Sequence, residues 1–510
     1  MTTARAIRVE PKTRRSLIVA LVIAMTMSLV AIAPSLAGAN GSDPTIAIGD
    51  SEHWDKIGGV DFTRYDCRFS GVADEISYTP LVATGTTVEF DVACSLVLPS
   101  NPSRWNGQIV VEPLDQVVPL IPEGEATRIL AVTDEVLFGG QGNRSGYASI
   151  SYAGTGLTDA IDQEFGLDGN SDGLPDAVAA AVEILADFPA ALRSGGESGL
   201  IGPDSTYGPV TAVEAMGFSN QGIAMRGAMA FGETHGLEVF DVALPMAANL
   251  SLTPDASGLT APPLPGTRDF GDQRALFLNS EGDVIPNGIY DVFGFAPIEG
   301  ATLELRVEAD DVNRFVYEVA GAAHLDPVNQ ADLLAFGVVL PGAFDDSSPL
   351  EWGAVIRAVF VQMRGWVTDG TSPAPSSLLD DPSDPLAADP AYPSSASVLK
   401  AKVDRDSNLN ALGGIRLPDV ELGVGTYLAV GPSMTFTGDI TTEFFQVLAG
   451  GFDDLECENL DGEPQFKNHG DYVNQVAKIT KGLVNDRFLL KADASEMKAG
   501  AGSSGIGACN

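Results

Sequence analysis

Alternating apolar and polar residues predict β-strands along the first third of the chain, and a run with helical spacing follows them. The segment 85–98 (GTTVEFDVACSLVL) alternates like a strand. Two short apolar runs, 107–112 (GQIVVE) and 146–152 (GYASISY), are also predicted to be strands. The stretch 176–195 (DAVAAAVEILADFPAALRSG) predicts a long helix.

Strands and helices then alternate. The pattern predicts a strand over 212–219 and a helix over 220–236, with further strands over 239–246, 274–286 and 313–326. Such alternation indicates an α/β fold with a mostly parallel sheet and helices on both faces. Because function in these sheets gathers beyond the carboxyl ends of the strands, residues at those positions are the first candidates for a site.

Ser219 lies at one such strand end, in the sequence GFSNQG (217–222). Many plain turns contain a Ser near glycines, so a nucleophilic role requires a base and an acid elsewhere in the chain. In a strand–turn–helix nucleophile elbow, small neighbours let the turn close, and the partners follow in the order Ser, acid, His. That order can be tested against the few histidines of this chain.

The chain has four histidines, so the base can be chosen by elimination. His53 precedes the predicted parallel sheet, and His469 lies near the C-terminus. His235 ends the helix that follows Ser219, roughly 24 Å away along the helix axis. His324, in the turn AGAAH after a predicted strand, has the right order, with a structural histidine in a turn as the alternative.

Two carboxylates at the preceding strand end are candidates for the acid. They lie in NSEGDV (279–284), and we prefer Asp283, which precedes VIP, over Glu281. The oxyanion of an acyl-transfer intermediate also needs backbone N–H donors. We expect one from Asn220, at the start of the helix, where the helix dipole contributes. The second is expected after the strand 107–112, near residues of the sequence EPLDQ, namely Leu114 or Asp115.

The sequence DGNSDGLPD (168–176) has part of the spacing of a calcium loop. Asp168, Asn170 and Asp172 place oxygen ligands at alternate positions, as a calcium loop does. Gly173 follows them, and Asp176 supplies a further oxygen ligand. Ala179 replaces the bidentate Glu of an EF-hand, which excludes the full motif. A structural calcium ion and a plain turn that caps the helix from Asp176 are both open, and no cofactor is expected for catalysis.

The N-terminus resembles an export signal. Basic residues precede the apolar run 17–34, and SLAGAN (35–40) offers small-residue cleavage sites after Ala37 or Ala39. We therefore expect a secreted or periplasmic protein. An uncleaved membrane anchor is the alternative, because the run approaches spanning length, and TRRSLI (13–18) weakly resembles a twin-arginine signal.

Charge and cysteine content narrow the partners. The 69 acidic against 29 basic residues give a net charge of −40, which excludes nucleic acid as a partner. No second long apolar run exists, so we expect no stable membrane insertion after signal cleavage. Four cysteines in an exported chain predict two disulfides, and proximity in the sequence favours Cys67–Cys94 and Cys457–Cys509.

Several motifs together resemble a poorly characterised, mostly bacterial family of large, esterase-like α/β-hydrolase proteins. RWNGQIVVEPLD (104–115) is similar to the strand before the family's oxyanion loop, and GFSNQG is similar to its Gly-x-Ser-Gln-Ser-Gly elbow. NSEGDV and VYEVAGAAHLD (316–326) resemble its acid and His turns. NALGGIRLPDVELGVGTY (410–427) contains the GGIRxP motif, the most specific of these.

The resemblance implies an α/β-hydrolase fold with Ser219 as nucleophile, His324 as base and Asp283 or Glu281 as acid. Gln221 stands where the familiar elbow has Gly and this family tends to have Ser, so its side chain is expected to point away from the turn. Arg416, in GGIRLP, is expected to pin a turn rather than bind substrate.

The expected organisation has four parts: a signal peptide (1–39), a β-rich segment (40–100), the hydrolase core (101–345) and a C-terminal extension packed on the core (346–510). The extension includes the Pro/Ser/Asp-rich loop 371–397.

The leading functional hypothesis is an exported serine esterase that acts on small-molecule esters through an acyl-enzyme. The alternatives are an amidase or acyltransferase with the same triad, and a catalytically silent hydrolase fold used for binding. The sequence does not specify an oligomeric state.

Overall fold

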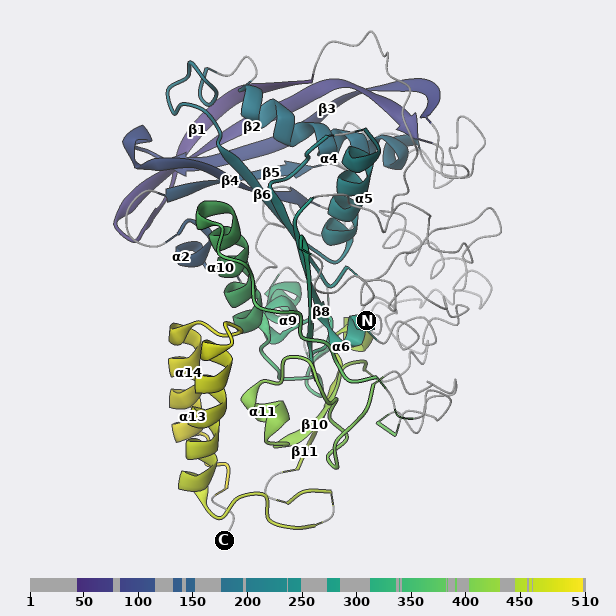
Figure 1. Cartoon of the computed structure of the whole chain (residues 1–510), viewed down its shortest axis with the longest axis vertical. Coiled ribbons are helices and arrows are strands. Elements are labelled where there is room, and N and C mark those ends of the chain that lie inside the picture. Colours follow the sequence, from purple (N-terminus) through teal and green to yellow (C-terminus); the bar gives the residue numbers. More distant parts are fainter. Residues whose placement is uncertain are drawn as a thin grey trace, which may run out of the picture.

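The structure is a computed structural model of the whole chain (Figure 1). It describes residues 44–76, 83–114, 132–139, 144–151, 176–195, 199–235, 237–248, 273–284, 312–335, 339, 342–381, 383, 390–391, 403–431, 445–455, 458–460 and 462–507. The predicted signal peptide lies outside these residues. So do Asp168, Asn170 and Asp172 of the predicted calcium loop, as well as Cys457 and Cys509.

Nine strands of the described chain form one sheet, in the order β1-β2-β3-β5-β4-β6-β7-β8-β9. The strands are β1 (Thr45–Ile57), β2 (Val60–Ile76), β3 (Ala83–Pro99), β4 (Trp105–Leu114), β5 (Arg144–Ser151), β6 (Ala212–Phe218), β7 (Val242–Met246), β8 (Ala275–Ser280) and β9 (Arg314–Val319). The long strands β1 to β3 pair antiparallel with one another, and β3 pairs antiparallel with β5. From β5 through β4 to β9 every pair is parallel, which confirms the predicted mostly parallel sheet.

Helices cover both faces of the parallel strands. Helices α4 (Asp176–Ser194) and α5 (Asn220–His235) lie on one side, and α10 (Gly353–Asp369) lies on the other (Figure 1). Successive residues of one strand enter different cores, since Val111 packs in the cluster with α4 and α5, and Val110 packs in the cluster with α10. Strands buried on both faces need apolar residues at nearly every position, which is why their sequences form continuous apolar runs.

The remaining elements are short or C-terminal. They are the 3₁₀ turn Pro102–Arg104, α2 (Asp134–Leu137), α6 (Glu281–Val284), α9 (Pro327–Ala335), α11 (Pro418–Glu421), β10 (Gly425–Leu428), β11 (Gly451–Asp454), α13 (His469–Asn485) and α14 (Lys491–Ser503). Helices α13 and α14 form a hairpin beside α10 (Figure 1). Phe488, after α13, packs edge-on against Tyr317 of β9 at 5.5 Å between ring centroids, so the C-terminal third contacts the sheet directly.

The predicted elements differ from the observed ones mainly at their ends. The strand predicted over 274–286 stops at Ser280, because residues 281–284 form helix α6. The strand predicted over 313–326 ends at Val319. The β-rich segment joins the same sheet as the core, and the domain boundaries stay a prediction. No helix within the described residues is both long and apolar enough to cross a membrane.

The predicted disulfide between Cys67 and Cys94 is present. The two residues face each other in the antiparallel register of β2 and β3, with their Cα atoms 4.8 Å apart. Both residues are buried in the core beneath α4. The bond therefore ties β2 to β3 at the position where Cys94 of β3 also pairs with Ile150 of β5.

Replacing both residues, Cys67→Ala/Cys94→Ala, is expected to lower the free energy of unfolding by roughly 2–4 kcal/mol. The bond joins residues 27 apart and so restricts the unfolded chain. Urea unfolding of the variant and the wild type measures the difference, and wild-type protein in reducing agent is the control. A variant as stable as the oxidised wild type would show that the bond adds nothing to stability.

Candidate active site

Ser219 occupies a sharp turn between strand β6 and helix α5. Its φ of 53° lies in the left-handed region, which is uncommon for a residue that has a Cβ. Its N–H donates to the carbonyl oxygen of Met246, at the end of β7, over 2.8 Å. Strained backbone of this kind persists where the surrounding structure determines it and is concentrated at functional sites. The turn therefore marks Ser219 as a functional candidate.

Two glycines allow this turn to close. A Cβ on Gly217 would lie 2.6 Å from the sulfur of Met225 and 2.8 Å from the backbone of Gln221. A Cβ on Gly222 would lie 2.8 Å from both the Cβ of Ala248 and the carbonyl oxygen of Gly217. Such distances are too short for real contacts, so only glycine fits at either position without a shift of its neighbours. The glycines thus let helix α5 start directly against strand β6.

The expectation that Gln221 points away from the turn is wrong. The residue is buried, and its side-chain oxygen accepts a hydrogen bond from the N–H of Phe218 over 3.2 Å. The side chain is long enough to reach back by three residues and to satisfy a backbone donor at the end of the strand. Gln221 therefore fits the tight turn by folding back on it.

Asp283 is oriented by a capping box at the start of helix α6. The hydroxyl of Ser280 accepts the N–H of Asp283 over 3.2 Å, while Oδ2 of Asp283 accepts both the N–H and the hydroxyl of Ser280, at 3.1 and 2.6 Å. All these groups are buried. One carboxylate oxygen is thus held by the cap, and the other remains to face His324.

His324 meets that second oxygen. Its Nδ1 lies 2.7 Å from Oδ1 of Asp283, and the two side chains are 5% and 0% exposed. The imidazole ring also contacts Phe218, the residue before Ser219, with 5.1 Å between ring centroids. The structure therefore brings His324 into contact with the carboxylate of Asp283 in α6 and with Phe218 at the end of β6, where an oriented imidazole can exchange protons with a neighbouring group.

Backbone hydrogen bonds join the carboxyl ends of neighbouring strands in this region. Besides the bond from Ser219 to Met246, the N–H of Ala247 donates to Leu278 over 2.8 Å, and the N–H of Gly282 donates to Ala322 over 3.1 Å. The three candidate residues accordingly lie beyond the ends of β6, β8 and β9, at one edge of the sheet.

Glu281, the other acid candidate, has different partners from Asp283. Its Oε2 accepts the N–H of Gly321 over 2.7 Å, and its Oε1 lies 3.0 Å from the guanidinium of Arg405. The side chain is fully buried. Of the two carboxylates, the structure pairs Asp283 with the imidazole and Glu281 with an arginine.

The other predicted site residues have mixed outcomes. Asn220 is the first residue of α5, so its N–H lies directly after Ser219 in the chain. Leu114 ends β4, which runs parallel beside β6, and Asp115 lies outside the described residues. Asp176 begins α4, and the described part of the chain holds no group of three or more His, Cys, Asp or Glu side chains placed to bind a metal.

Two residues that hold the site, Ser280 and Arg405, were not among the predicted ones, and the direction of Gln221 was predicted wrongly. The sequence does contain a signal for Ser280, because Ser-x-x-Asp before a short helix is the pattern of a capping box. It contains none for Arg405, since an arginine in a distant loop does not indicate its partner. The expected turn-pinning role of Arg416 agrees with its contacts, which join it to Glu421 at 2.6 Å and Asp406 at 2.7 Å.

Asp326 lies two residues beyond His324 and is almost fully buried. Its Oδ1 accepts the N–H groups of Val328 and Asn329, both at 3.0 Å, at the start of α9. Burial raises the pKa of Asp326 above its usual value, and the nearby negative charge of Glu351 adds to the rise, against the backbone hydrogen bonds, which lower it. The charged form of this carboxyl is therefore disfavoured in the folded protein.

A family model described as an alpha/beta hydrolase domain matches residues 135–499. The chain belongs to this family. The matched residues of this alpha/beta hydrolase include Ser219, Asp283 and His324 and extend through α13 into α14. The resemblance found in the sequence is confirmed, although the motif at 104–115 precedes the matched range.

Solved structures of three esterases are similar in part. A glucuronoyl esterase from Teredinibacter turnerae is 16% identical, with 46% of this chain and 51% of that chain covered and a TM-score of 0.26. A glucuronoyl esterase from Solibacter usitatus is 12% identical, with 64% and 93% covered and a TM-score of 0.30. A hyperthermophilic esterase from Pyrobaculum calidifontis is 11% identical, with 61% and 83% covered and a TM-score of 0.28. The chain thus spans about half the length of the first of these proteins. No sequence among curated proteins matches the chain significantly.

Replacing Gly222 with Ala in this alpha/beta hydrolase is expected to lower the free energy of unfolding by about 1–3 kcal/mol, because the new methyl group overlaps Ala248 and the carbonyl of Gly217. Thermal or urea unfolding measures the loss. Gly482→Ala in α13 is the matched control, since apart from its chain neighbours and the backbone of its own helix no atom of the described residues lies within 4 Å of the new Cβ. The control should be as stable as the wild type or gain up to about 1 kcal/mol, and equal effects at the two positions would contradict the packing argument.

Asp326→Asn is expected to stabilise the protein at neutral pH. The side-chain oxygen of Asn keeps both hydrogen bonds to α9, while the charge that burial disfavours is removed. The pKa of Asp326 is higher in the folded state than in the unfolded state, so the wild type loses stability as pH rises through the folded-state pKa. The total loss is about 1.4 kcal/mol for each pKa unit by which the two states differ. Unfolding measured between pH 3 and 8 should show the advantage of Asn vanishing below about pH 4. An advantage that does not change with pH would contradict this account.

Proposed function

We propose that the chain is an exported serine hydrolase that cleaves carboxylic esters of small molecules through an acyl-enzyme. The observation that carries the proposal is the buried hydrogen bond between Asp283 and His324, with the imidazole against Phe218 in the elbow that presents Ser219. The strained turn, the oriented imidazole and the buried carboxylate are the three features that a serine nucleophile requires. Membership of the alpha/beta hydrolase family supports the same assignment.

The carboxylate sets the state of the imidazole. With Nδ1 bonded to Oδ1 of Asp283, the Nδ1–H tautomer is favoured, and Nε2 is the ring nitrogen left to accept the proton of Ser219. The hydroxyl oxygen then attacks the ester carbonyl, and the protonated imidazole returns its proton to the departing alcohol. Water, deprotonated by the same Nε2, attacks the acyl-enzyme and releases the acid. Asp283 holds the imidazole in place throughout and stabilises the imidazolium.

The oxyanion is assigned to backbone donors. Asn220 is the first residue of α5. The first N–H groups of a helix have no partner within the helix, and they lie at the positive end of the helix dipole. We assign the second donor to Leu114, the last residue of β4, or to Asp115, the next residue in the chain, because β4 lies beside β6 in the sheet. No cofactor takes part in this mechanism, and a calcium ion at residues 168–176 would have a structural role only.

Ser219→Ala is expected to abolish labelling by a fluorophosphonate probe and to lower kcat/KM toward p-nitrophenyl esters by at least about a thousand-fold. Asp283→Asn should lose on the order of ten thousand-fold in kcat, since the wrong tautomer of His324 is then favoured. A series of p-nitrophenyl esters of graded acyl length, with matching anilides, defines the acyl group and separates esterase from amidase activity.

Ser194→Ala is the matched control for the serine replacement. Ser194 lies at the end of α4 and donates to the carbonyl of Ala191 over 3.0 Å, away from the strand ends, so labelling and turnover should be unchanged. A folded wild type that is neither labelled nor active would favour a binding role. Faster hydrolysis of the anilides than of the esters would favour an amidase, and ester turnover that rises with added alcohol would favour acyl transfer.

A further inference from the structure

The outer edge of strand β9 is covered by segments of the C-terminal third. Ser377 and Ile415 form bridges with Tyr317 and Val319, parallel to β9. The N–H of Glu318 donates to Ser377 over 2.9 Å, and its carbonyl accepts the N–H of Ile415 over 2.8 Å. The strand that leads to His324 is therefore held on both sides, by β8 and by residues far along the chain.

The same part of the chain also contacts helix α6, through Arg405. The guanidinium of Arg405 lies 3.0 Å from Oε1 of Glu281, and the two side chains are 3% and 0% exposed. The other oxygen of Glu281 accepts the N–H of Gly321, which has a φ of 72° and starts the turn that ends at His324. Glu281 itself is the first residue of α6, two positions before Asp283. One carboxylate thus connects α6 with the Gly321 turn.

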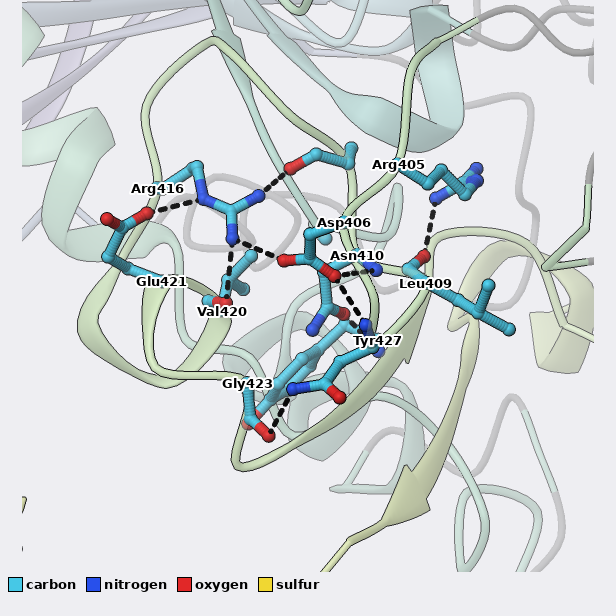
Figure 2. A network of polar contacts seen from close by, with 12 residues as sticks. Arg405, Asp406, Leu409, Asn410, Arg416, Val420, Glu421, Gly423 and Tyr427 are labelled. Atoms are coloured by element: carbon cyan, nitrogen blue, oxygen red, sulfur yellow. Dashed lines mark hydrogen bonds and ion pairs between the residues drawn. The ribbon is translucent and has the colours of Figure 1, made fainter. Parts of the chain in front are cut away.

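Arg405 lies in a loop that makes several hydrogen bonds of its own. It donates to the carbonyl of Leu409 over 3.1 Å (Figure 2). Next to it, Asp406 accepts the N–H group of Asn410 and pairs with Arg416 (Figure 2). Asp406 also accepts the N–H group of Asn408. The guanidinium of Arg405 therefore belongs to a loop whose shape is fixed by its own hydrogen bonds.

A buried ion pair of this kind adds little to stability compared with apolar residues of the same size, because desolvation of both charges offsets their attraction. Its contribution here is geometric. The hydrogen bond between Asp283 and His324 depends on the relative placement of α6 and the Gly321 turn, and Glu281 bonds to the turn while it belongs to the helix. A misplacement of about 1 Å at a catalytic pair can cost on the order of a hundred-fold in rate.

We propose that Arg405 and Glu281 are positioning residues that set the distance between Asp283 and His324 from the C-terminal third of the chain. The kinetic part of this inference rests on the proposed esterase function, whereas the geometric part does not. Neither residue touches substrate; both act through the turn and the helix that carry the imidazole and its carboxylate.

The kinetic test uses Arg405→Met, Glu281→Gln and the double variant Glu281→Gln/Arg405→Met. Each single variant breaks the contact between the two charges and keeps one of them, whereas the double variant removes both charges and keeps an oxygen that can accept the N–H of Gly321. We expect Arg405→Met to lose about 10- to 100-fold in kcat with KM within about twofold. In the double variant the melting temperature should recover while kcat stays low, and Arg405→Lys should recover part of kcat.

The matched control is Arg357→Met. Arg357 of α10 pairs with Asp493 of α14 at 2.7 Å, with side chains 19% and 9% exposed, so it also links the C-terminal helices to the core but does not touch the His324 turn. Its loss should lower the melting temperature and leave kcat within about twofold. A purely structural role for Arg405 predicts that kcat recovers with stability in the double variant, and that result would overturn the inference.

A second readout is independent of esterase activity. A proton held between imidazole Nδ1 and a carboxylate gives a resolved downfield proton NMR resonance, which His324→Ala identifies by its absence. This resonance should shift or broaden in Arg405→Met, Arg405→Lys and the double variant, and stay unchanged in Arg357→Met. If the wild type hydrolyses no ester, the proposed function fails and this resonance alone decides the positioning role. An unaltered resonance in the folded double variant would refute it.

Discussion

The hydrogen bond between Asp283 and His324 imposes the strictest geometric demand on this fold. Its two residues follow different strands, and both side chains are buried, so the 2.7 Å contact forms only when the ends of β8 and β9 keep their register. The capping box of α6 fixes one partner, and the turn that begins at Gly321 fixes the other. Parallel pairing from β6 to β9 keeps the strand ends level, and burial of both faces of the sheet maintains that pairing.

Most of the core could be predicted from the period of its apolar residues. The strand and helix expected over 212–219 and 220–236 differ by one residue at their ends from β6 and α5. The strand expected over 274–286 was too long, because the residues directly after Ser280 turn into helix α6. Hydrophobic periodicity does not reveal the side-chain cap formed by Ser280 and Asp283, which starts helix α6 and so ends the strand.

The candidate site was predictable as a set of residues but not as an arrangement. Chain order was enough to select His324 and to narrow the acid to Glu281 and Asp283. Both are carboxylates, both are fully buried, and they are two residues apart, so only their partners distinguish them. Arg405 is far from both in the sequence, and no local pattern connects an arginine in a C-terminal loop with a carboxylate after β8.

Strand β9 also has a consequence for how the molecule is made. Its outer edge is satisfied by Ser377 and Ile415, which leave the ribosome well after β9 itself. Until Ser377 and Ile415 have been synthesised, the outer edge of β9 exposes unpaired backbone groups. Such groups are a template for pairing with another chain. The nascent protein therefore passes through a stage at which its sheet is nearly complete but its exposed edge is prone to aggregation. Until the C-terminal third has been synthesised, this edge has to be protected from other chains.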